Sequence, residues 1–301
     1  MSTSPAELTP ETTERHLHRA TQVVLIMGLA LALLCLAVRL QMKFHLIGTL
    51  NQEDICLAIA CIFCVATQVI ILYALDNAGL GVHIRHLTQD TVSQYQKLLL
   101  AASCLFVTGV GLARLSHLIF FHRLMAAKHW LRYFLLLMMA FIISGSFALI
   151  CCFVFACRPV SKAWDVAISG RCMDRPAIFL AVAVSNIVSD LCLIALPVPL
   201  ISGLHLSLSQ KVRFAILFSL VCVTFVASAI RLRLTIPLLG SEDLTYAMAP
   251  VALLVGVESN LIIIAASLPA MRQLCHLVSS RLSLAEGLST EPNARRWSAG
   301  L

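Results

Sequence analysis

Seven apolar stretches, each long enough to cross a lipid bilayer, constrain the fold of this chain more than any other feature of its 301 residues. A bilayer core of about 30 Å takes roughly 20 residues of helix. Lipid offers the backbone no hydrogen-bond partners, and the stretches lack the alternation of a membrane barrel, so each is expected to be a helix. The expected spans are Thr21–Val38, Ile55–Leu75, Leu98–Phe121, Leu131–Ala156, Ala177–Ser202, Val212–Ile230 and Thr245–Met271.

The charge content also indicates a membrane protein. Charged residues make up 12% of the chain and hydrophobic residues 59%, which leaves too few charges for the surface of a soluble domain. The net charge of +7 is scattered between the apolar stretches, without a basic run that interleaves with aromatics, and this argues against nucleic-acid binding. We therefore predict an all-α fold, a multi-pass seven-transmembrane helix bundle in the plasma membrane or an endomembrane, with the lipid bilayer as its surroundings.

The connections between the spans are too short to hold a second folded domain. One transmembrane domain is therefore expected over residues 21–271. The polar segments on either side, residues 1–20 and 272–301, are expected to be poorly ordered tails. Pro197 and Pro199 are expected to kink or stop the fifth helix, because proline lacks the amide hydrogen that a helix interior needs.

The segment CRPVSKAWDVAISGRC, between the fourth and fifth spans, bears on the orientation of the chain. Counting Lys and Arg gives eleven on one side of the membrane and ten on the other, and this difference is too small to distinguish the two possible orientations. Cys157 and Cys172 sit at the two feet of this loop, whereas most of the other cysteines lie within apolar spans. A disulfide here would stabilise the fold by about 3 kcal/mol in the loop-entropy model, and disulfides persist in oxidising compartments. We predict a Cys157–Cys172 bridge and an N-terminus outside; two unpaired thiols are the alternative.

Three charged residues fall deep inside the expected spans, away from their ends, where charge is costly and marks candidate functional positions. They are Arg114, Asp190 and Glu258, at similar depths in the third, fifth and seventh spans. We expect Arg114 to pair with Asp190 or with Glu258, which leaves the other carboxyl unpaired or protonated. Asn186 lies one turn from Asp190, and Asn260 follows Glu258, so both amides can extend this polar network between helices.

Three interpretations of these charges remain open. The favoured one is a structural clasp between helices, and the second is a switch that responds to a ligand or to protons. In the third, Asp190 or Glu258 is a catalytic acid that protonates a lipophilic substrate in a cyclisation or an isomerisation. His83 and His86 are the only closely spaced histidines that suggest a metal, and they lack a third ligand. We expect a structural hydrogen bond there, with no metal and no cofactor in the protein.

Several motifs in this order resemble those of the fungal rhodopsin-like integral membrane proteins, over about residues 20–275. The motifs are the acidic pair Glu53–Asp54, GLGVH from Gly79, ARLSHLIFFHRL from Ala113, CRPV followed by WD and by Cys172, Asn186 and Asp190 before PVP, and VESNLIIIAASLPAMR from Val257. The resemblance implies seven transmembrane helices. The family includes receptor-like proteins of plant-pathogenic fungi and proteins encoded in mycotoxin gene clusters such as the satratoxin cluster.

The resemblance does not imply retinal binding here. A retinal Schiff base needs a lysine in the seventh helix, and Thr245–Met271 contains none. The resemblance leaves two classes of function: an accessory or enzymatic component of a secondary-metabolite pathway, which meets a lipophilic small molecule, or a receptor-like sensor of extracellular cues. The loops expected inside are short, and no cysteine-rich segment precedes the first span, so we expect the pathway role.

Overall fold

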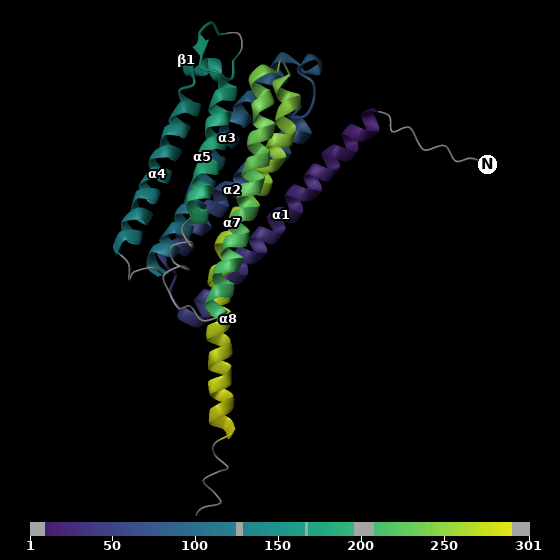
Figure 1. The fold of residues 1–301 in the computed structure, drawn as a ribbon. Helices are drawn as coiled ribbons and strands as arrows, with labels where there is room; N and C mark the ends of the chain where they lie inside the picture. The colour runs from purple at the N-terminus through teal and green to yellow at the C-terminus, as the bar shows by residue number, and fades with distance from the viewer. Residues whose placement is uncertain (1–9, 125–128, 166–167, 196–207, 242, 291–301) are drawn as a thin grey trace, which may run out of the picture.

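Seven long helices run side by side in the computed structural model, which describes residues 10–124, 129–165, 168–195, 208–241 and 243–290 (Figure 1). The helices are α1 (Pro10–Ile47), α2 (Gln52–Asn77), α3 (Gln89–Leu124), α4 (His129–Val154), α5 (Arg175–Ala195), α7 (Leu208–Thr235) and α8 (Leu244–Thr290). Each of the seven contributes a stretch long and apolar enough to cross a membrane. The all-α, seven-transmembrane fold expected from the sequence is confirmed.

The outside of the bundle is apolar. Met27, Ile62, Leu137 and Phe147, from α1, α2 and α4, are each between 65% and 69% exposed. Soluble monomers rarely expose so much continuous apolar surface, whereas lipid chains cover it without cost. The protein is therefore a multi-pass membrane protein.

Helix α3 lies at the centre of the packing, against α2, α4 and α8. Helix α7 packs between α5 and α8, while α1 crosses the bundle obliquely against α8 and α2 (Figure 1). Small residues permit the closest of these approaches: a Cβ atom added to Gly109 of α3 would lie 2.9 Å from Sγ of Cys64 on α2. The interior also buries many polar side chains, which need partners from neighbouring helices.

A short hairpin closes the loop between α4 and α5. Its strands, β1 (Cys157–Arg158) and β2 (Arg171–Cys172), pair antiparallel with Cys157 opposite Cys172, and a disulfide joins the two cysteines. The predicted bridge is confirmed. The first 3-10 turn of the loop, η2 (Val160–Ala163), is tied to the bundle by Arg175, which donates to the Ala163 carbonyl and to Gln96 of α3. The loop is thus fixed over one end of the bundle, called here the loop end.

The turn after α2 contains two glycines with left-handed backbone, Gly79 (φ 70°) and Gly81 (φ 89°), which is why the GLGVH motif needs glycine there. The 3-10 turn η1 (Ile84–His86) follows. Nδ1 of His83 lies 3.2 Å from Oδ2 of Asp243, and its ring stacks on Tyr246 at 4.4 Å. His83 therefore has the structural hydrogen bond that we expected, and the described residues contain no group of three metal-binding side chains.

The ends of several helices differ from the expected spans. Helix α1 begins at Pro10 and α8 continues to Thr290, so helix extends into both segments that we expected as poorly ordered tails. Helix α5 ends at Ala195; Pro197 and Pro199 lie outside the described residues. The sixth membrane stretch covers Phe218–Gly240 and includes the 3-10 turn η3 (Ile236–Gly240). Arg231, which follows the expected span Val212–Ile230, therefore lies within the membrane-spanning part.

Candidate functional site

Four charged side chains meet in the middle of the bundle. Nη2 of Arg114 on α3 lies 2.9 Å from Oδ1 of Asp190 on α5 and 3.7 Å from Oε1 of Glu258 on α8. Nε of Arg231 on α7 lies 2.7 Å from Oε2 of Glu258. None of the four residues is more than 3% exposed. The two cations therefore balance two carboxylates, and neither carboxyl is left unpaired, which differs from our expectation of a single arginine.

Two uncharged side chains complete this central network, which comprises Arg114, Asn186, Asp190, Ser228, Arg231 and Glu258. The Asn186 side chain accepts a hydrogen bond from Nη1 of Arg114 (2.7 Å) and donates one to Oε1 of Glu258 (2.8 Å). The Ser228 hydroxyl lies 2.8 Å from Oδ2 of Asp190 and 3.1 Å from Oε1 of Glu258, and its single hydrogen goes to one of them. The network links α3, α5, α7 and α8.

Arg231 was missed because the expected sixth span ends at Ile230, one residue before it, whereas Ser228 lies inside that span and was missed because a serine carries no charge. The segment that follows Arg231, LRLTIPLLG, contains one further arginine and is otherwise mainly apolar. Arg231 and Ser228 lie three residues apart on α7, and this spacing places both side chains on one helix face. Extending the span to the next glycine would have brought Arg231 to membrane depth.

Asn260 does not join the central network. Its Oδ1 accepts a hydrogen bond from Nε2 of Gln68 (2.7 Å), and its Nδ2 donates to Oε1 of Gln68 (3.3 Å). This buried amide pair connects α8 to α2. The residue that we expected beside the carboxylates therefore serves a different helix contact.

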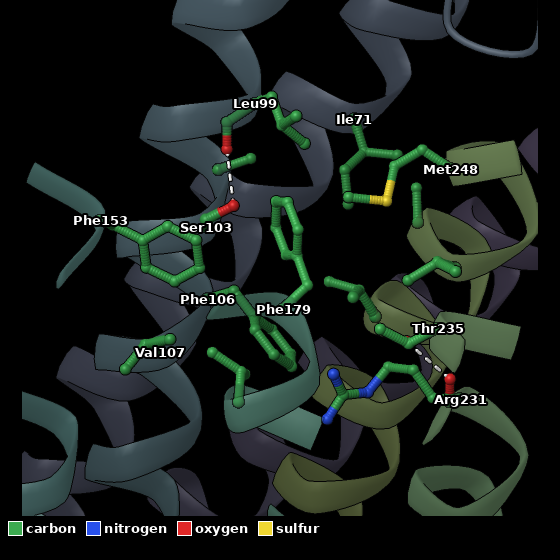
Figure 2. A pocket seen from close by; sticks show the side chains of 15 residues that line it. Ile71, Leu99, Ser103, Phe106, Val107, Phe153, Phe179, Arg231, Thr235 and Met248 are labelled. Carbon is green, nitrogen blue, oxygen red and sulfur yellow. Dashed lines mark hydrogen bonds between the residues drawn. The ribbon is translucent and has the colours of Figure 1, made fainter. Parts of the chain in front are cut away.

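An apolar cavity of about 60 Å³ lies between the helices on the loop-end side of the network (Figure 2). Arg231 lies at its edge with its guanidinium group pointing from α7 toward the aromatic wall, 5.4 Å from the ring centre of Phe106. The cavity is lined by Ile71, Leu99, Ala102, Ser103, Phe106, Val107, Phe153, Phe179, Val182, Arg231, Thr235, Met248, Val251, Ala252 and Val255.

The central network begins one helical turn below this cavity. On α5, Val182 lines the cavity and Asn186 is the next residue on the same face. On α8, Val255 lines the cavity and Glu258 follows one turn later. Arg231 belongs to both the cavity wall and the network. A molecule in the cavity would therefore reach the buried carboxylates through Arg231.

A second group of buried charges lies at the opposite end of the bundle from the loop end. This end cluster comprises Arg39, Lys43, Glu53, Asp54 and Arg123. Asp54 accepts from Nη2 of Arg39 (2.7 Å) and from Nζ of Lys43 (2.5 Å), and Glu53 accepts from Lys43 (3.1 Å) and Arg123 (3.4 Å). All three cations lie outside the expected spans, in connections, but Arg39 and Lys43 are at most 5% exposed.

The motif ARLSHLIFFHRL of α3 serves both groups of charges. Arg114 belongs to the central network and Arg123 to the end cluster. Between them, Oγ of Ser116 donates to the Glu53 carbonyl (2.7 Å), and Nε2 of His117 donates to the Ala265 carbonyl of α8 (3.2 Å). Along this motif, α3 therefore contacts first α5 and α8, then α2, then α8, and finally α2 again.

Comparisons with known proteins agree with this architecture. A family model described as the fungal rhodopsin domain matches residues 38–277. A SAT4 family membrane protein of Emericella nidulans is 28% identical over 177 residues, which is 57% of this chain and 45% of that protein. Wortmanamides biosynthesis cluster protein C of Talaromyces wortmannii is 25% identical over 254 residues, 82% of this chain and 68% of that protein.

A third relative is the polyenoic acids biosynthesis gene cluster protein Ba17b of Metarhizium anisopliae, 30% identical over 153 residues, 48% of this chain and 41% of that protein. The chain thus spans less than half the length of two of these three relatives. No solved structure matches. The family match covers most of the chain, with the disulfide, the cavity and both groups of buried charges inside it, and the chain belongs to the fungal rhodopsin domain family.

Proposed function

We propose that the protein is a membrane-embedded component of a biosynthetic pathway for a lipophilic metabolite, and that it acts on this metabolite by proton transfer. The observation that carries the proposal is the position of the central network, one helical turn from an apolar cavity and joined to it by Arg231. A lipophilic molecule that enters the cavity from the bilayer would contact Arg231, one helical turn from the almost fully buried carboxylates.

Glu258 and Asp190 are the proposed catalytic residues. A carboxylate that takes a proton from one atom of a substrate and returns it at another atom catalyses an isomerisation or a cyclisation without a further reactant. Glu258 is the more directly linked of the two to the cavity, because Arg231 of the cavity wall contacts its Oε2. The guanidinium group of Arg231 is placed to stabilise negative charge that develops on the substrate.

The relatives support the setting of this proposal. Two of them carry names that refer to biosynthesis clusters, for polyenoic acids and for wortmanamides. For this chain we propose, from these names, only a role in a biosynthetic pathway of this kind. The disulfide supports an orientation in which the loop end and the N-terminus face an oxidising compartment. Quantitative alkylation of Cys157 and Cys172 in the absence of reductant would contradict that orientation.

A receptor-like sensor without retinal is the second candidate, and one observation favours it. Helix α8 continues from the end of its membrane stretch at Leu268 to Thr290, away from the bundle (Figure 1). Such a helix gives a partner protein a place to bind. In a sensor, the cavity would hold the cue and the central network would change its pairing when the cue binds.

Metabolite profiling of a deletion strain tests the proposal. The strain is complemented with Glu258→Gln or Asp190→Asn, and product is normalised to the level of protein in the membrane. Both changes keep shape and remove the carboxylate. If these residues transfer protons, the pathway stops at a lipophilic precursor although the protein reaches the membrane.

Asp54→Asn is the matched control, because Asp54 is equally buried but belongs to the end cluster. With this variant, product should fall only in proportion to protein. A normal product profile from both Glu258→Gln and Asp190→Asn at normal abundance would exclude proton transfer. If, in addition, the expression of responsive genes shifted, the sensor would be the better proposal.

A further inference from the structure

The cavity at Arg231 adjoins a second cavity toward the loop end. This second cavity, of about 30 Å³, reaches Ala163 and Arg175 beneath the disulfide-closed loop and shares Leu99, Ser103, Phe153 and Phe179 with the first. The two adjoining cavities, called here the passage, lie along α3 and α5, with Arg231 at one end. Their small volumes suit a thin apolar chain better than a broad ring system.

The Arg231 end of the passage has an unused hydrogen-bond donor. Nη2 of Arg231 has no hydrogen-bond partner among the described residues, although the side chain is only 3% exposed. Nε of the same group is already satisfied by Glu258. A buried guanidinium N–H without an acceptor is costly, so an acceptor supplied by a ligand is favoured at this position.

The charges around Arg231 indicate what kind of acceptor fits. In the central network, Arg114 and Arg231 balance Asp190 and Glu258, so the site already has no net charge. A ligand carboxylate would add an uncompensated negative charge next to Glu258 in a medium of low polarity, which is unfavourable. A neutral carbonyl oxygen supplies the missing acceptor without adding charge. Nη2 of Arg231 therefore lacks a hydrogen-bond acceptor, whereas its charge is already balanced.

We infer that this passage binds a neutral carbonyl compound with an extended apolar chain, an ester, ketone or amide, whose carbonyl oxygen accepts a hydrogen bond from Nη2 of Arg231. The inference rests on the proposed function in one respect, which is that the ligand is a metabolite of the pathway. It adds the chemical class of that metabolite and the end by which it is held. The carbonyl end would lie at the central network, and the chain would extend toward the loop end.

Binding of three matched probes to the purified protein in detergent micelles tests the inference. The probes are methyl octanoate, octanoate and octane, and calorimetric affinities are corrected for partition into empty micelles. Methyl octanoate should bind about tenfold more tightly than octane, the ratio expected for one buried hydrogen bond, and more tightly than octanoate. Equal affinity for methyl octanoate and octane, or tighter binding of octanoate, would overturn the inference.

Filling the passage tests its location. Ser103 lines both cavities, and its hydroxyl donates to the Leu99 carbonyl of its own helix. Ser103→Phe should abolish the binding of methyl octanoate. Ala101→Phe is the matched control, because Ala101 lies on the exposed side of α3 two residues earlier. Unchanged binding by Ser103→Phe, at the affinity of Ala101→Phe, would place the probe elsewhere and overturn the inference.

Two changes in the network test the role of charge. The double variant Arg231→Met with Glu258→Gln keeps the charge balanced, and in it methyl octanoate should bind no better than octane. Glu258→Gln alone leaves one positive charge in excess, and octanoate should then bind at least as tightly as methyl octanoate. Retention of ester selectivity by the double variant would contradict the inference. The probe affinities do not depend on pathway turnover. The proposed function fails if Glu258→Gln gives a normal product profile, and that outcome is distinct from a failure of the binding test.

Discussion

The central network and the end cluster are both buried groups of charges between helices, but they differ in how completely the protein satisfies them. In the end cluster, Asp54 accepts hydrogen bonds from Arg39 and Lys43, and no buried side-chain atom of the cluster lacks a partner among the described residues. In the central network, Nε of Arg114 and Nη2 of Arg231 both lack one. The protein alone therefore fulfils the hydrogen-bonding capacity of the first group and not of the second.

This difference agrees with the proposal that the central network binds a ligand, and with a structural role for the end cluster. Complete pairing suits a structural role, because the side chains hold α1 against α2 and, through the hydrogen bond from Arg39 to the Ala266 carbonyl, against α8. Incomplete pairing next to a cavity suits a role with a ligand. A small cavity of about 20 Å³ borders Arg114, whereas Arg231 lines the larger apolar cavity.

The largest expected effect on stability comes from the end cluster. Asp54→Asn leaves Arg39 and Lys43 with Glu53 as the single carboxylate, and arginine cannot lose its proton to become neutral. Breaking a buried ion pair in this way costs about 3–5 kcal/mol. Thermal unfolding in micelles should therefore show a large fall in melting temperature. Asp76→Asn is the control, because the Asp76 side chain is 52% exposed on the same helix. Similar melting of the two variants would remove the clasp interpretation of the end cluster.

A smaller loss of stability is expected in the central network. Arg114→Met leaves Asp190 and Glu258 with Arg231, Asn186 and Ser228 as donors. One carboxylate can then take up a proton and become neutral, which a guanidinium group cannot do, so the cost should be roughly half of that for Asp54→Asn. The same unfolding measurement compares the two variants. An Arg114→Met protein that melts like the parent would show that the central network contributes nothing to packing.

The sequence predicted the helices well because each membrane span is a local, additive property of its apolar residues. It also predicted the loop disulfide, since Cys157 and Cys172 stand at the water boundary. Arg114, Asp190 and Glu258 were found for a related reason: a charge inside an apolar stretch is conspicuous. The structure brings these three residues together at the depths that helix geometry gives.

The sequence did not reveal charges near the ends of spans. Arg39, Lys43 and Arg231 follow apolar runs directly, and a hydropathy pattern cannot distinguish a residue that leaves the membrane from one that turns back into the bundle. The distinction depends on whether a neighbouring helix supplies a carboxylate to pair with the cation, as Asp54 and Glu258 do here. The same limit applies to Asn260, whose partner Gln68 is 192 residues away. Such pairings are properties of tertiary packing and not of the local sequence.

The smallest expected effect compares the buried and the exposed cation that pair with Glu53 in the end cluster. Lys43 and Arg123 donate to the same oxygen of Glu53, at 3.1 Å and 3.4 Å, but their side chains are 6% and 62% exposed, and Lys43 also pairs with Asp54. An exposed ion pair contributes about 0–1 kcal/mol, because water and salt screen it. Arg123→Gln should therefore change the unfolding free energy by less than about 1 kcal/mol, whereas Lys43→Gln should cost several times more. Measured side by side in micelles, equal losses for the two variants would mean that solvent reaches Lys43 as freely as Arg123, and the end cluster would then be an ordinary surface salt bridge.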